Sequence, residues 1–106
     1  MHVKPSYFAL LKSGDKLVEF RLNDAKRKKI SPGDKIEFIC QSNLSTALVL
    51  SVSNVISSPD FNSLLKKLSP TILGDISFDD QLSDLRNLYP LDSEKEHGVI
   101  AIILKG

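Results

Sequence analysis

Residues 98–105, GVIAIILK, constrain the fold of this chain more than any other segment. Every residue between Gly98 and Lys105 is apolar, so a strand formed here presents hydrophobic side chains on both of its faces. Such a strand is typical of the middle of a sheet that is covered on both sides. The segment therefore predicts a central strand.

Four further segments have patterns typical of strands. They are residues 2–4, 17–22, 35–41 and 46–56. In the last of these, Leu48, Leu50 and Val52 alternate, whereas Val55 is out of phase with them. Because a β-bulge inserts one extra residue into a strand, a bulge near residues 53–54 would bring Val55 onto the core face.

Helices are expected between the strands. The first covers residues 5–13 and ends at Gly14, a favoured residue after a helix. The second begins with Ser58 as its N-cap and Pro59 in the first helical position, and the third spans residues 77–90. Apolar residues at helical spacing define the inner faces of the last two helices: Phe61, Leu64, Leu65 and Leu68, and then Phe78, Leu82, Leu85 and Leu88.

Length and element order together indicate the fold class. The 106 residues predict a single domain, 1–106, which is large enough to bury its own core. Short strands with local turns, such as SPGD at residues 31–34, alternate with helices. This arrangement favours an α+β fold, a small mixed β-barrel with about three flanking helices, over a doubly wound α/β sheet.

The composition excludes several classes of protein. Cys40 is the single cysteine and lies in the apolar run KIEFIC, which predicts a buried thiol, no internal disulfide and a cytoplasmic location. No apolar run approaches the roughly 18 residues of a membrane span, and the N-terminus lacks the pattern of a signal peptide. His2 and His97 do not have the spacing of metal ligands, so no metal or other cofactor is expected.

Charge is distributed unevenly along the chain, although the formal net charge is only +1. Residues 1–40 hold nine Lys and Arg against five Asp and Glu, a balance of +4, whereas residues 41–106 hold five against eight, a balance of −3. The densest basic run is Lys26, Arg27, Lys28 and Lys29. It is either a solvated loop or a source of non-specific phosphate contacts.

The segment GDKLVEFRLND, residues 14–24, alternates like a strand and also concentrates charge. Residues two apart share a face of a strand, so Glu19 and Arg21 are neighbours and the apolar residues between them face the core. Glu19 can orient Arg21, whose remaining donors could then bind a phosphate or a base edge. The alternative is a surface ion pair worth about 0–1 kcal/mol. Lys16 is expected in the turn after Gly14, from which its amine can bend toward the same place.

Aromatic residues supply possible stacking partners for nucleobases. Tyr7, Phe8, Phe20 and Phe38 could stack on bases, yet their helix and strand periodicity assigns most of them to the core. Tyr89 closes a helix beside Pro90, and its hydroxyl either reaches the site or completes packing.

The order of these segments resembles the ASCH domain family. The matching pieces are YFALLKSGDKLVEFRLND, SPGDKIEF, LRNLYP and HGVIAIIL. The resemblance implies a PUA-like β-barrel with a cleft for RNA or a modified nucleobase. The family motif G-x-K-x-x-E-x-R, which is expected to line that cleft, falls on Gly14, Lys16, Glu19 and Arg21.

One branch of the family, the small bacterial acetylcytidine amidohydrolases, is enzymatic and combines a lysine with a threonine nucleophile. The lysine falls on Lys16, whereas the threonine position is occupied by Glu19, which cannot act in the same way. A hydrolase reading, with Lys16 and Glu19 as candidate catalytic residues and a Glu19-assisted water, is the alternative to a binding function.

The sequence therefore predicts a module that binds RNA or a modified nucleoside. The expected ligand-binding residues are Lys12, Lys16, Glu19, Arg21, Lys26, Arg27, Lys28, Lys29 and Tyr89. A small hydrolase of acylated nucleosides or RNA, and a protein-interaction domain without a nucleic-acid ligand, are the alternatives.

Overall fold

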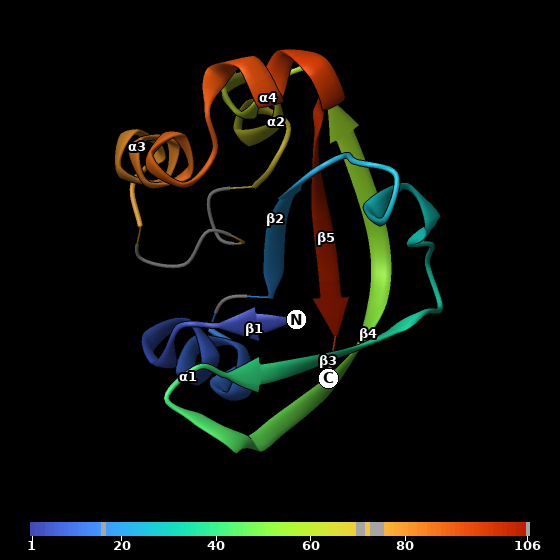
Figure 1. Cartoon of the computed structure of the whole chain (residues 1–106), viewed down its shortest axis with the longest axis vertical. Helices are drawn as coiled ribbons and strands as arrows, with labels where there is room; N and C mark the ends of the chain where they lie inside the picture. Colours follow the sequence, from blue (N-terminus) through green and yellow to red (C-terminus); the bar gives the residue numbers. More distant parts are fainter. Residues whose placement is uncertain (16, 70–71, 73–75, 106) are drawn as a thin grey trace.

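The computed structural model describes residues 1–15, 17–69, 72 and 76–105. Its strands form one sheet with the order β1-β3-β4-β5-β2 (Figure 1). The strands are β1 (His2–Val3), β2 (Val18–Leu22), β3 (Lys35–Cys40), β4 (Asn43–Ser58) and β5 (Val99–Lys105). The helices are α1 (Pro5–Ser13), α2 (Phe61–Lys66), α3 (Phe78–Leu88) and α4 (Leu91–His97), and a 3-10 turn, η1 (Arg27–Lys29), follows β2.

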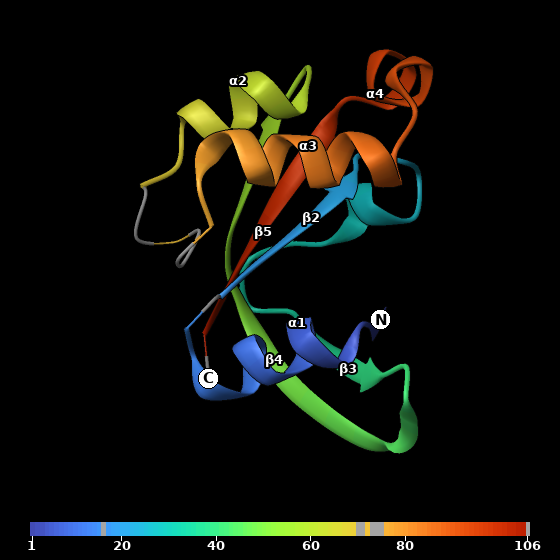
Figure 2. The same ribbon diagram turned by 90° about the vertical axis from the view of Figure 1, so that its left-hand side faces the viewer.

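The sheet is mixed and curls into a half-barrel. β1 pairs with β3 in parallel, whereas the other neighbouring strands are antiparallel. The first part of β4 pairs with β3 and its second part pairs with β5, so this long strand joins both sides of the curl (Figure 2). The α+β fold with a small mixed barrel is thus confirmed.

β5 occupies the central position that its two apolar faces predicted, between β4 and β2. Ile100, Ile102 and Leu104 belong to one hydrophobic core, and Val99 and Ala101 belong to another. Because side chains alternate across a strand, these two cores lie on opposite faces of the sheet. β5 therefore separates the two halves of the interior.

Each core is closed by different helices. Phe8 and Leu11 of α1 pack into the core that contains Ile100 and Ile102, which we call the α1 core. α2 and α3 close the other, which we call the α2–α3 core, through residues that include Phe61. Figures 1 and 2 show α2, α3 and α4 together at one end of the molecule, and α1 with β1 and β3 at the other.

The bulge predicted near residues 53–54 is present. The register between β4 and β5 shifts between Val52 and Asn54. Val55 packs against the α1 core together with Val52, whereas Ile56 packs against the α2–α3 core. The extra residue thus returns Val55 to the face of Val52, as the sequence pattern required.

Two predicted helix boundaries are confirmed and one is wrong. Gly14 ends α1 in the left-handed conformation, with φ of 83°, and Ser77 caps α3 by accepting from Asp80 N at 3.2 Å. The N-cap of α2 is Asp60 rather than Ser58, since Asp60 accepts from Ser63 N at 2.7 Å. Ser58 instead pairs with Val99 as the last residue of β4, because the strand continues two residues further than predicted.

The end of α3 differs from its predicted form. Leu88 was expected to face inward, but it is 59% exposed. α4 begins three residues later at Leu91 and was not predicted, because LDSEKEH has no apolar stripe at helical spacing. The described residues thus contain one helix more than the expected three.

Removing the N-cap of α2 tests the corrected boundary. Asp60→Ala should lower the free energy of unfolding by about 1 kcal/mol. Asp60→Asn should retain most of this contribution of the cap, because Asn also caps helices. The hydrogen bond from Ser63 N lowers the pKa of Asp60. The carboxylate's contribution is therefore present above the unfolded-state pKa and is lost as the pH falls through the lower folded value.

Urea unfolding at neutral and acid pH measures both effects, with Asp84→Ala, an exposed position within α3, as the control. Equal stabilities for Asp60→Ala and Asp84→Ala at neutral pH would contradict the cap.

Candidate functional site

The pairing of β2 with β5 sets the direction of the charged residues in β2. Glu19 lies opposite Ile102 and Arg21 lies opposite Ile100. Directly paired residues point to the same face of a sheet, so both charged side chains lie on the side of the α1 core. Val18 and Phe20 point the other way into the α2–α3 core, which confirms the predicted apolar face.

Glu19 and Arg21 form a partly buried ion pair. Arg21 Nε donates to Glu19 Oε1 at 3.1 Å, and the side chains are 21% and 9% exposed, respectively. This is more buried than the surface ion pair that the sequence left as an alternative. The hydrogen bond uses Nε, and no bond to the described residues uses the two terminal nitrogens of Arg21. The pair therefore combines a buried carboxylate with guanidinium donors near the surface.

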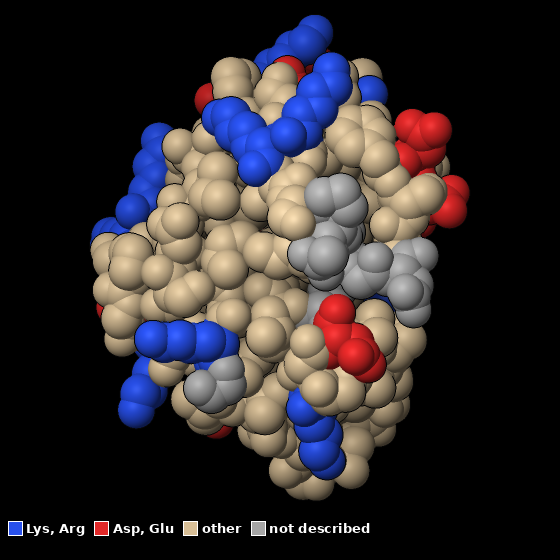
Figure 3. Space-filling view, turned by 180° about the vertical axis from the view of Figure 1, so that it is seen from behind, with Lys and Arg blue, Asp and Glu red and all other residues tan. Residues whose placement is uncertain are grey.

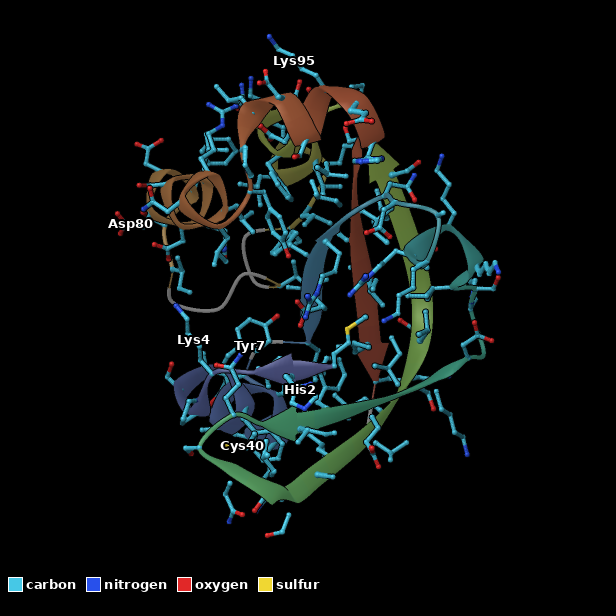
Figure 4. All side chains as sticks on the ribbon, in the orientation of Figure 1. His2, Lys4, Tyr7, Cys40, Asp80 and Lys95 are labelled. Carbon is cyan, nitrogen blue, oxygen red and sulfur yellow. The ribbon has the colours of Figure 1, made fainter. Side chains whose placement is uncertain are left out.

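Tyr7 joins α1 to the edge of β2 beside this pair. Its hydroxyl donates to the carbonyl oxygen of Val18, the residue before Glu19. Figure 4 shows Tyr7 between α1 and β2. Burial, and to a smaller extent the Glu19 carboxylate, raise the pKa of Tyr7, so the phenol remains a neutral donor at physiological pH. The sequence pattern had assigned Tyr7 mainly to packing.

Tyr89 lies at the end of the molecule that carries α2 and α3 and packs against the α2–α3 core. It caps the C-terminus of α3, and its ring packs against Phe61 with ring centroids 5.6 Å apart. Tyr89 makes a minor contribution to the raised pKa of Tyr7. Its ring completes packing, which is one of the two roles considered from the sequence, and the reach of its hydroxyl to the site stays a prediction.

The predicted basic residues lie in two separate parts of the structure, around η1 and in α1. Lys26, Lys28 and Lys29 are exposed at η1, whereas Arg27 pairs with Asp24 at 3.6 Å. In Figures 1 and 2, η1 lies on the opposite side of the molecule from α3. Lys12 is exposed in the last turn of α1.

The Met1 α-amino group is influenced by both the basic run and the Glu19–Arg21 pair. Burial and the nearby Arg21 lower the pKa of the Met1 α-amino group, and Lys26 acts in the same direction. Arg21 and Lys26 are thus both within electrostatic range of one amine. Lys16, the remaining predicted site residue, lies outside the described residues.

The face opposite to that drawn in Figure 1 carries basic side chains in several places. Figure 3 shows Lys and Arg side chains there in separate groups around a broad uncharged area, with one group at the end that carries α2 and α4. Within the described parts of the chain, no group of three His, Cys, Asp or Glu side chains could hold a metal ion. Among the same residues, no helix is both long and apolar enough to cross a membrane.

The environment of Tyr7 can be tested by spectrophotometric titration. The chain has two tyrosines and no tryptophan, so Tyr89→Phe leaves Tyr7 as the single phenol. We expect its absorbance change well above the ordinary pKa of about 10. Because the folded-state pKa is raised, the contribution to stability is complete below pH ~10 and is lost as the pH rises further. An ordinary titration in the folded variant would contradict the buried hydrogen bond.

Comparison with known proteins identifies the family. The ASCH domain model matches residues 1–105. The hypothetical protein PH0355 has a similar structure, with 30% identity, a TM-score of 0.82, and coverage of 99% of this chain and 94% of that chain. The protein PF0455 from Pyrococcus furiosus has 25% identity and a TM-score of 0.69, with coverage of 99% and 96%.

ASCH from Zymomonas mobilis shares the fold at 15% identity, with a TM-score of 0.66 and coverage of 100% of this chain and 65% of that chain. A search of functionally curated proteins gives no match. The family match spans nearly the whole chain, and the curled mixed sheet with flanking helices agrees with the PUA-like fold that the resemblance implied. The chain belongs to the ASCH domain family.

Proposed function

We propose that this ASCH domain binds RNA or a modified nucleoside at the Glu19–Arg21 pair. The observation that carries the proposal is the 3.1 Å bond between a nearly buried carboxylate and a partly exposed guanidinium. Partial burial strengthens hydrogen bonds to a ligand because the local dielectric is lower than that of water. The family match supports the same class of ligand.

The chemistry of the pair suits the edge of a nucleobase. Arginine presents several donors in a planar fork, which matches carbonyl oxygens and phosphates. Glu19 fixes the orientation of this fork through its bond to Arg21 Nε, while the carboxylate itself is buried. Arg21, oriented by Glu19, would therefore read an edge or a phosphate that carries acceptor oxygens.

Tyr7 and Tyr89 supply the surroundings of the pair in this proposal. Tyr7 holds α1 against β2 next to Glu19, and Tyr89, at the end of α3, is the proposed stacking residue. Aromatic rings beside a base-reading pair favour stacking of an unpaired base. A single-stranded RNA or a free nucleoside is thus a better ligand than a duplex.

The exposed lysines of η1 are the proposed contacts to flanking phosphates. Lys26, Lys28 and Lys29 project from the loop after β2, and Lys12, Lys16 and Arg27 complete the predicted basic set. Such contacts add affinity without base specificity. Together with the single buried Cys40, which fits a reducing compartment, they lead us to propose a cytoplasmic RNA as the ligand.

Substitution of the ion pair tests the binding site. Arg21→Ala and Glu19→Ala should each weaken binding of a short fluorescein-labelled oligocytidylate about tenfold or more, because charge-assisted hydrogen bonds contribute about 1.5–3 kcal/mol. Fluorescence anisotropy measures the affinity. Lys66→Ala on α2 is the control and should bind like the unmodified protein. Equal affinities of the unmodified protein, Arg21→Ala, Glu19→Ala and Lys66→Ala would mean that the RNA binds elsewhere.

The salt dependence of the same titration tests the lysines of η1. Each phosphate contact contributes about 0.7 to the slope of log K against log salt for a single strand. Lys28→Ala combined with Lys29→Ala should therefore reduce the slope, while Arg21→Ala should still weaken binding in that background. An unchanged slope would remove η1 from the interface.

A further inference from the structure

Glu94 is a buried carboxylate on a helix that is otherwise largely polar. α4 presents several exposed charged side chains, yet Glu94 is 1% exposed. Burial of an ionised carboxylate costs several kcal/mol unless other groups compensate for the lost water. The partners of Glu94 therefore indicate which parts of the molecule it holds.

Its two oxygens are directed at two different helices. Glu94 Oε1 accepts from Phe61 N, the first residue of α2, at 2.9 Å. Glu94 Oε2 lies 3.8 Å from Nε of Arg86 on α3, in an ion pair whose arginine is 40% exposed. Phe61 N is one of the amides that a helix leaves without an internal acceptor, so a carboxylate is well suited to it.

Both partners of Glu94 are structurally connected to Tyr89. The ring of Phe61 packs against Tyr89 with an angle of 30° between the ring planes. Arg86 precedes Tyr89 by three residues in α3, and Tyr89 N donates to Leu85 O at 2.9 Å at the end of that helix. One carboxylate thus contacts the helix that carries Tyr89 and the residue against which Tyr89 packs.

We infer that Glu94 is a positioning residue that fixes the Tyr89 ring against Phe61 at the end of α3. The inference rests on the proposed function for its consequence in RNA binding, while the placement of Tyr89 is a property of the free protein. Glu94 holds the start of α2 and the end of α3 at a set separation. This separation determines where the Tyr89 ring lies, and Tyr89 is one of the proposed ligand-binding residues.

Tyrosine fluorescence tests the placement without any ligand. In a Tyr7→Phe background, Tyr89 is the single fluorescent tyrosine, and the chain has no tryptophan. Glu94→Ala should raise the acrylamide quenching of Tyr89, because its packing against Phe61 loosens. Glu96→Ala, the same change at a side chain 74% exposed on α4, is the matched control and should leave quenching unchanged. Unchanged quenching in a folded Glu94→Ala protein would overturn the inference.

A second pair of variants keeps the test valid if Glu94→Ala does not fold. Glu94→Gln retains an acceptor for Phe61 N, and Arg86→Ala removes the partly exposed partner on α3. Quenching in Glu94→Gln should stay close to that of the background protein, whereas Arg86→Ala should raise it. Stronger quenching in Glu94→Gln than in Arg86→Ala would also overturn the inference.

Oligocytidylate binding then connects placement to the site. In the wild-type background, Glu94→Ala, or Arg86→Ala if the former does not fold, should weaken binding about fivefold or more, the lower limit for loss of a base–aromatic stack. Looser Tyr89 packing with unchanged affinity would remove Glu94 from the binding site. If the unmodified protein binds no RNA, the proposed function fails, while the quenching result still decides the placement of Tyr89.

Discussion

The antiparallel pairing of β2 with β5 is the interaction on which the proposed site depends. β5 places Ile100 and Ile102 in the α1 core and Ala101 in the α2–α3 core, so its partner must present alternate residues to the same two faces. Glu19 and Arg21 lie on the α1 side for this reason alone. A shift of one residue in register would exchange the two faces and bury both charges against α2 and α3.

The ion pair is stable at this position because its surroundings compensate for partial burial. Glu19 is nearly inaccessible but accepts from Arg21, and the Arg21 side chain remains 21% exposed. Tyr7 closes one side through its bond to Val18 O. A site of this kind favours partners that supply an acceptor to the guanidinium, because hydrogen bonds to a charged donor are stronger than neutral ones.

Much of this arrangement could be predicted from local patterns. The central strand, the bulge that returns Val55 to the core and the helix end at Gly14 each follow from short-range rules that no distant contact opposes. The parity of residues 18–22 also placed Glu19 and Arg21 on one face, but parity does not show that α1 covers that face. The degree of burial of the ion pair is visible only in the folded structure.

The elements that sequence patterns missed depend on tertiary partners in the same way. The start of α2 moved to Asp60 because pairing with β5 extends β4, and α4 has no apolar periodicity that would reveal it. Glu94 looks like an ordinary surface glutamate until Phe61 N, far away in sequence, is seen to bind it. Site residues that act through such contacts need the folded structure for their detection.

NMR titration of the isotope-labelled protein with short oligocytidylate reports where the ligand binds. Binding at the Glu19–Arg21 pair should give the largest shifts at the amides of Glu19 and Arg21, at the Arg21 Nε–H and at the ring signals of Tyr7 and Tyr89, with smaller shifts at η1. Shifts confined to α2 or to the outer face of β4, with the β2 signals unchanged, would contradict it.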